Sequence, residues 1–184
     1  MAVDTEVLQF FVRHRQPWLT SIARVATAFG SSAVVIPLGI MVGLVARRVR
    51  RSWAPLVMLA SAYVGGEALF QTLKALVGRA RPPAALAIGH FTGTAFPSGH
   101  ATLSAAVYGA MGALATGARR VAAWAAAAAV AVVVGMTRLY LGAHWLTDVL
   151  AGWALGAGWL AVVVVARSRL LRPPAGTSSR SVSP

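Results

Sequence analysis

Long apolar runs alternate with short polar or basic segments over most of this chain. Five of these runs are long enough, with a few flanking residues, to cross the ~30 Å hydrocarbon core of a bilayer as helices. They cover residues 32–46, 53–77, 98–116, 121–136 and 144–166. The pattern predicts an all-α integral membrane helical bundle with five clear transmembrane helices and no second domain.

Residues 4–29 follow a different pattern, in which basic side chains interrupt the apolar ones. Pro17 divides this segment into two pieces. The pattern predicts N-terminal interfacial helices that are amphipathic and lie in the membrane surface. A sixth crossing within residues 7–29 is the alternative. The interrupting residues are Arg13, His14, Arg15 and Arg24.

The composition is that of a membrane protein. Hydrophobic residues make up 58% of the 184 residues, charged residues only 11%, and the mean hydropathy is +0.70. We expect one membrane-embedded domain over residues 1–172 and a disordered Pro/Ser-rich tail over residues 173–184. The chain has no Cys, so disulfides and thiolate metal sites are excluded.

The formal net charge of +13 could suggest a nucleic-acid-binding protein. Most of the arginines outside the reactive clusters described below gather instead between or after apolar runs, at residues 47–51, 119–120 and 167–180. This is the pattern of topogenic anchors, so we expect membrane lipids and no nucleic acid as partners. The positive-inside rule places these anchors in the cytoplasm, and the loops at 78–97 and 137–143 outside, in a protein of the plasma (inner) membrane.

Reactive side chains form three clusters at predicted helix ends. The first cluster lies at the end of the second predicted span. The second cluster lies at the start of the third span, and the third cluster lies between the fourth and fifth spans. Counting the crossings puts all three clusters on one side, the extracytoplasmic side, so a single site can contain them. The clusters are Lys74 with Arg81, then Ser98, Gly99 and His100, and finally Arg138, His144 and Asp148.

These residue types suit the transfer of a phosphoryl group. His144 and Asp148 are four residues apart at a predicted helix start, so the carboxylate can orient the imidazole. A neutral, oriented imidazole can attack phosphorus, and His100 can protonate the departing oxygen. The Ser98 and Gly99 amides at a helix start can bind phosphate together with the three cations of the clusters.

Metal chemistry has little support in the sequence. Of the four acidic residues, Asp4 and Glu6 lie at the terminus, which leaves only Glu67 and Asp148. Two carboxylates are too few for a conventional two-metal phosphatase site. We expect no metal and no cofactor.

Three motifs resemble the signature motifs of the type 2 phosphatidic acid phosphatase family, membrane lipid phosphate phosphatases related to vanadium haloperoxidases. They are Lys74-x6-Arg81-Pro82, Pro97-Ser98-Gly99-His100 and Arg138-x5-His144-x3-Asp148. The resemblance implies that His144 is the nucleophile that forms a phosphohistidine, with Asp148 as its partner and His100 as the general acid. It also implies that phosphate is held by Lys74, Arg81, Ser98, Gly99 and Arg138. One departure is Thr137, where the family usually has Ser, and it keeps a hydroxyl.

The expected function is hydrolysis of a lipid phosphomonoester or pyrophosphate. Undecaprenyl pyrophosphate, phosphatidate and phosphatidylglycerol phosphate remain open as substrates, because the motifs read phosphate and not the rest of the lipid. An external site favours the pyrophosphate of a carrier lipid. Transfer of the phosphoryl group to an acceptor alcohol and a non-catalytic membrane scaffold are the alternatives, and the oligomeric state is not predicted.

Overall fold

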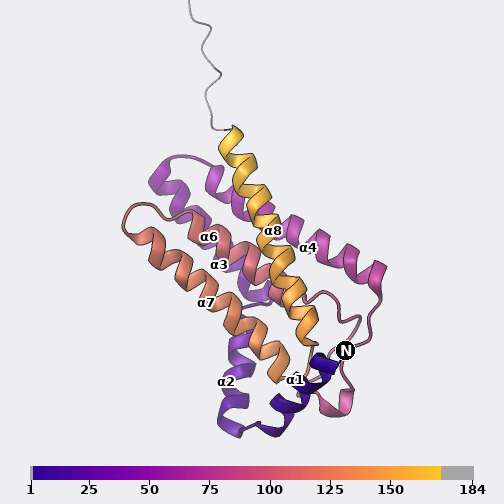
Figure 1. Cartoon of the computed structure of the whole chain (residues 1–184). Helices are drawn as coiled ribbons and strands as arrows, with labels where there is room; N and C mark the ends of the chain where they lie inside the picture. The colour runs from indigo at the N-terminus through magenta and orange to yellow at the C-terminus, as the bar shows by residue number, and fades with distance from the viewer. Residues whose placement is uncertain (1, 171–184) are drawn as a thin grey trace, which may run out of the picture.

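The computed structural model describes residues 2–170, over which every regular element is a helix (Figure 1). The predicted tail at residues 173–184 lies outside the described residues. In chain order the elements are α1 (Ala2–Arg13), α2 (Pro17–Ala28), α3 (Ser32–Arg50), α4 (Ala54–Val77), the 3-10 turn η1 (Ala84–Leu86), α5 (Gly99–Leu103), the π-helical turn η2 (Ser104–Tyr108), α6 (Gly109–Ala113), α7 (Arg119–Tyr140) and α8 (Leu146–Leu170).

Four helices, α3, α4, α7 and α8, are long and apolar enough to cross a membrane. They match four of the five predicted spans, but several predicted boundaries are shifted by two to four residues. The helix expected to end at residue 136 continues to Tyr140, so Thr137 and Arg138 are helical rather than part of a break. The turn is made by Leu141 and Gly142, whose amides bond to Thr137 O and Leu139 O, and Gly142 has a φ of 68° that favours glycine.

The predicted third span is a shorter, composite helix at the centre of the bundle. It runs from Gly99 to Ala113 through α5, η2 and α6, three segments of five residues each. At ~1.5 Å per residue this is shorter than the ~30 Å of a full crossing. The segment packs against α4, α7 and α8, which screen it from the membrane.

Two glycines of α8 let this central helix approach closely. A Cβ at Gly152 would stand 2.6 Å from Ser98 O, and a Cβ at Gly156 would overlap Thr102 O. The Gly152-x3-Gly156 spacing therefore makes the packing notch that the sequence indicates. Close contact between α8 and the start of α5 fixes Ser98 relative to Asp148, because both residues lie at this crossing.

The N-terminal segment forms two separate helices, as the proline predicts. Each has 12 residues, about 18 Å, which is too short for the sixth crossing considered above. Helix α2 packs along the second half of α7, and Thr20 near its start contacts the Tyr140 hydroxyl. Just after the end of α2, Phe29 O accepts a hydrogen bond from Tyr108 of η2. The interfacial location of these helices stays a prediction.

The two ends of the bundle differ in charge chemistry. At one end, next to the end of α3, Arg47 stacks on Trp53, Arg50 donates to Leu114 O, and Arg167 contacts Met58 near the end of α8. The ion pairs among the described residues all lie at the opposite end, where α1 and α2 cap the bundle (Figure 1). That end contains the three reactive clusters.

Candidate active site

The three sequence clusters meet where α4 and α7 end and where α5 and α8 begin. His100, in the first turn of α5, interacts electrostatically with residues of both other clusters. Burial increases from the mouth of the site inwards: Lys74 and Arg81 are half-buried, whereas Ser98, Arg138, His144 and Asp148 are buried. The residues that interact with His100 are Lys74, Arg81, Arg138 and His144.

His144 and Asp148 are held by the start of α8, although His144 is not itself helical. The helix begins at Leu146, two residues later than expected, and the Asp148 carboxylate accepts a hydrogen bond from Trp145 N at 2.9 Å. This is half of a capping box, in which a side chain in the first turn binds the amide at the cap. The same Asp148 Oδ2 lies 3.6 Å from His144 Nδ1.

The contacts of the His144 ring define its protonation state. Its Nε2 lies 3.3 Å from a guanidinium nitrogen of Arg81, which can only donate. We therefore assign the lone pair to Nε2 and the proton to Nδ1, on the side of Asp148. A nitrogen lone pair thus faces the cations, as a nucleophile for an anion requires.

Burial also keeps the His144 ring neutral. Burial, together with the positive charges of Arg138 and Arg81, lowers the pKa of His144 to about 4 from an ordinary value of 6.5, against the opposing effect of Asp148.

Each of the three expected cations is fixed by backbone or side-chain oxygens. Lys74 donates to Thr94 O at 2.6 Å. Arg81 donates to Thr92 O, Gly93 O and Ala143 O, which ties the loop after α4 to the turn before α8. These bonds leave each cation with further donors, so the group can bind an anion without being rebuilt.

The Ser98 amide does not have the role that we expected. Ser98 N donates to Asp148 O at 3.0 Å, so this amide is already used to join α5 to α8. Ser98 is the N-cap and Gly99 the first helical residue, so Pro97 precedes the first turn and is not part of it. The Ser98 hydroxyl is fully buried and, within residues 2–170, has no hydrogen-bond partner, which leaves it available to a ligand.

Two charged residues that we had not placed in the site are part of it. Arg79 donates to Asp148 Oδ1 and to Asp4 Oδ2, both at 2.7 Å. Asp4 had been set aside as terminal, yet only 3% of its side chain is exposed. The sequence holds one hint of this role, which is that the chain has few acidic residues. A buried Asp148 needs a cation beside it, and that cation needs a second carboxylate to balance its charge.

Two further neighbours hold Arg138 from outside its own helix. Thr27 of α2 accepts a hydrogen bond from Arg138 at 2.9 Å, and the guanidinium carbon lies 4.8 Å from the centre of the Phe91 ring. Phe91 also lies 6.0 Å from the Arg81 guanidinium, so one ring flanks two cations. Neither residue has a sequence signal, because each contact depends on how distant segments pack.

The chain is similar in sequence to known membrane enzymes. A family model described as the PAP2 superfamily matches residues 51–172. Phosphatidylglycerophosphatase B of Bacillus subtilis is 32% identical over 84% of this chain and 78% of the relative. A lipid A 1-phosphatase of Rhizobium etli is 34% identical over 79% and 71%, respectively. An undecaprenyl-diphosphatase of Sulfolobus acidocaldarius is 31% identical over 74% and 65%.

The fold is also similar to a solved structure. The crystal structure of a transmembrane PAP2 type phosphatidylglycerolphosphate phosphatase from Bacillus subtilis superposes with a TM-score of 0.88 at 30% identity. The match covers 93% of this chain and 87% of that chain. This likeness confirms the predicted all-α membrane bundle, while the assignment of individual site residues stays a prediction.

The buried neutral ring leads to a prediction about pH. His144 should titrate near pH 4, and Asp148→Asn should lower this midpoint, because the carboxylate favours the charged ring. An unfolded histidine binds a proton near pH 6.5, so the stabilisation from neutral His144 is present above that pH and is lost as the pH falls towards 4. Nitrogen NMR of histidine-labelled protein in detergent resolves the four histidines. A midpoint at or above 6.5 would contradict the assignment.

Proposed function

This chain belongs to the PAP2 superfamily, and from that premise we propose that it hydrolyses a phosphate monoester or pyrophosphate at the head of a membrane lipid. One observation supports this most strongly. Nε2 of His144, to which we assign the lone pair, lies 3.3 Å from Arg81, in a site that also contains Lys74, Arg138 and a second histidine. A nucleophile beside three cations is the arrangement that phosphoryl transfer needs.

In the first step, Nε2 of His144 attacks phosphorus and the bond from phosphorus to the lipid oxygen, or to the bridging oxygen of a pyrophosphate, breaks. His100, protonated once the anionic substrate offsets the surrounding cations, gives its proton to the departing oxygen. Positive charge then develops on the His144 ring, where Asp148 stabilises it through Nδ1. The cations Lys74, Arg81 and Arg138, with the Ser98 hydroxyl, bind the equatorial oxygens of phosphorus.

In the second step, water attacks the phosphohistidine. His100 takes a proton from the water, the bond from phosphorus to Nε2 breaks, and its electron pair returns to the ring. The products are inorganic phosphate and the free site when a single phosphate is transferred. An acceptor alcohol in place of water would make the protein a phosphotransferase, which the same intermediate allows.

We propose that these steps need no divalent metal. Asp148 and Asp4 are the buried carboxylates at this end of the described bundle, and Arg79 binds both. The charge on the phosphate is offset instead by side-chain cations, which perform the role that Mg²⁺ has in other phosphoryl-transfer sites.

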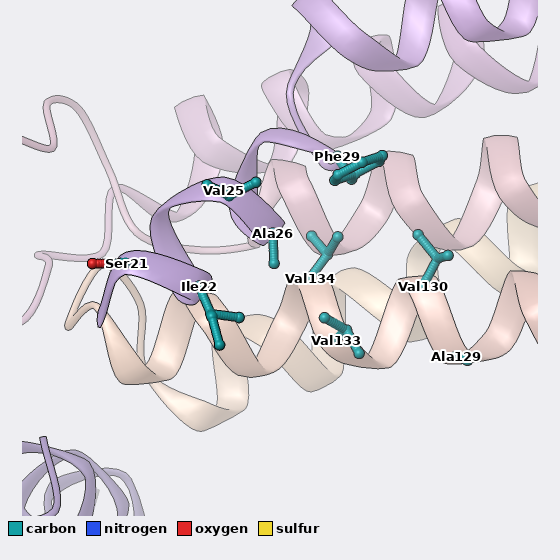
Figure 2. A pocket seen from close by; sticks show the side chains of 9 residues that line it. All are labelled: Ser21, Ile22, Val25, Ala26, Phe29, Ala129, Val130, Val133 and Val134. Carbon is teal, nitrogen blue, oxygen red and sulfur yellow. The ribbon is translucent and has the colours of Figure 1, made fainter. Parts of the chain in front are cut away.

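An apolar groove beside the site suits the lipid part of the substrate. It has a volume of about 620 Å³ and runs between α2 and α7, where Ile22 and Ala26 point towards Val133 and Val134 (Figure 2). Gly30 packs between the groove residue Val134 and the site: a Cβ there would lie 3.0 Å from His100 and would overlap Val134. A chain in this groove would place a lipid phosphate next to His100.

Three lipid classes are the candidate substrates. The relatives include a phosphatidylglycerophosphatase, a lipid A 1-phosphatase and an undecaprenyl-diphosphatase. We place phosphatidylglycerol phosphate, phosphatidate and undecaprenyl pyrophosphate on the list of candidates. A site on the outer face favours the pyrophosphate, because a carrier lipid is released there.

The distribution of arginines supports an extracytoplasmic site in the plasma membrane. The end opposite the site carries the anchors at residues 47–51 and 119–120 and the end of α8. Most cations at the site end have local partners: Arg79 binds carboxylates, and Arg15 donates to Tyr140 O and Leu86 O. The positive-inside rule then assigns the opposite end to the cytoplasm.

Phosphate release tests the function directly. Purified protein in detergent should release phosphate from at least one of the three lipids, in the presence of EDTA. His144→Ala should lower this rate by more than about 10⁴-fold and remove an acid-labile phosphoenzyme, because it removes the nucleophile. Full activity of the variant, or turnover that EDTA abolishes and Mg²⁺ restores, would refute the mechanism. Phosphorylated acceptor in place of free phosphate would identify a transferase.

Two adjacent valines of α7 test the groove. Val133 lines it and is 50% exposed, whereas Val132 does not line it and is 49% exposed. Val133→Trp should lower kcat/KM about tenfold for a long-chain lipid phosphate, since a loss of about 1.4 kcal/mol corresponds to two displaced methylenes. It should leave a short-chain soluble analogue unaffected. Val132→Trp is the matched control, and equal effects of both variants would exclude the groove.

Single cysteines test the orientation, because the chain has none of its own. Ala85 lies exposed in the loop at the site end, and Ala118 lies exposed in the turn before α7. An impermeant thiol reagent should label Ala85→Cys in intact cells and should label Ala118→Cys only after the cells are opened. The reverse pattern would place the site in the cytoplasm.

A further inference from the structure

We propose that Arg79 and Asp4 are a positioning pair that holds Asp148, and through it His144, in the reactive geometry. The inference rests on the proposed function, because it assigns a role in the same site. Neither residue contacts the place where the phosphate would bind. They act through a chain of contacts that runs from α1 to the imidazole.

Asp148 cannot be oriented by His144 alone. Its carboxylate is fully buried, and the distance from Oδ2 to His144 Nδ1 is 3.6 Å, beyond the usual range of a hydrogen bond. The two shorter bonds come from elsewhere, from Arg79 to Oδ1 at 2.7 Å and from Trp145 N to Oδ2 at 2.9 Å. The rotamer that presents Oδ2 to the imidazole is therefore set by Arg79 and the helix cap.

Arg79 is itself held at both ends of its guanidinium fork. One terminal nitrogen binds Asp148 and the Thr147 hydroxyl, the latter at 2.6 Å, and the other binds Asp4 at 2.7 Å. The side chain also lies 5.7 Å from the centre of the Trp145 ring. A planar fork between two carboxylates gives a fixed geometry that a lysine cannot reproduce.

Asp4 anchors Arg79 and also the start of α8. Its Oδ1 accepts Thr147 N at 2.9 Å, one of the amides that the first turn of a helix leaves unpaired. Burial alone would raise the pKa of Asp4, but the hydrogen bonds from Thr147 and Arg79 outweigh it and lower the pKa. Asp4 therefore stays charged and joins α1 to the helix that contains Asp148.

In this arrangement the cations of the site form two groups, one that binds phosphate and one that positions Asp148. Lys74, Arg81 and Arg138 are aimed at the phosphate, whereas Arg79 is neutralised by two carboxylates and turned away from it. Without Asp4, the guanidinium would lose one of its two anchors and Asp148 would lose a fixed partner. The expected defect is in the chemical step, since the residues that bind phosphate are untouched.

The test combines four variants with two measurements. The variants are Arg79→Gln, Arg79→Lys, Asp4→Asn and the double variant Asp4→Asn/Arg79→Gln. The control is Glu6→Gln, which, like Asp4→Asn, removes one negative charge from α1, but at an exposed position. The first measurement is kcat and KM for a lipid phosphate that the wild type hydrolyses. The second is the tautomer of His144 by nitrogen NMR, which does not depend on turnover.

Arg79→Gln should lower kcat by about 10- to 100-fold, the range found when a partner that orients a reactive group is removed, while KM changes less than about twofold. Arg79→Lys should recover part of kcat. The double variant should be no worse than Arg79→Gln, because Asp4 acts through Arg79, and Glu6→Gln should match the wild type. In the NMR spectrum, Arg79→Gln should mix the Nδ1–H tautomer of His144 with the other form.

Three results would overturn the inference. The first is an unchanged kcat and tautomer in Arg79→Gln. The second is a raised KM at constant kcat in that variant, which would make Arg79 a phosphate ligand. The third is additive losses in the double variant, which would make Asp4 a general stabiliser. Failure of the proposed function is distinct, because the wild type would then release no phosphate from any lipid. The NMR comparison still decides the positioning role in that case.

Discussion

A carboxylate that is completely buried must be compensated by its neighbours, and Asp148 meets this constraint in a way that organises the whole site. Desolvating an unpaired charge would cost several kcal/mol. Asp148 instead binds Arg79 and Trp145 N through its side chain, and its carbonyl oxygen accepts Ser98 N at 3.0 Å. These bonds connect the loop after α4, the start of α5 and the start of α8. The same residue thus compensates its own burial and sets the relative position of the elements that bear the reactive side chains.

The parts of this structure that follow from local patterns could be predicted from sequence. The spans could be read because a membrane helix needs a continuous apolar run, and α4 begins and ends within a residue of its predicted limits. The meeting of Lys74, His100 and His144 followed from counting crossings, since alternate helix ends lie on the same side. The resemblance to the type 2 phosphatidic acid phosphatase family is confirmed by the comparisons. Where a boundary failed, as at Tyr140, a positive φ at the next glycine ended the helix instead of the polar residues before it.

Contacts between distant segments could not be predicted in the same way. Arg79 lies in the loop after α4, and nothing local shows that it turns towards Asp148 while Arg81 turns towards His144. Thr27 and Phe91 flank Arg138 only because α2 and the loop fold over the end of α7. The amide of Ser98 was expected to face phosphate, yet the close approach of α8 at Gly152 gives it a protein partner first. In each case the deciding interaction depends on tertiary packing, which periodicity does not describe.

The anchoring of α8 by Asp4 has a consequence for biosynthesis. Asp4 and its partner Thr147 are separated by 143 residues, so the first helix leaves the ribosome long before the last one is made. Contacts of such long range form late in folding. A nascent chain can already display Lys74, Arg81 and His100, but His144, the proposed nucleophile, and Asp148 beside it arrive only with α8. Under the proposed function, the order of translation therefore keeps the site incomplete until α8 is made and the N-terminal helix can close onto it.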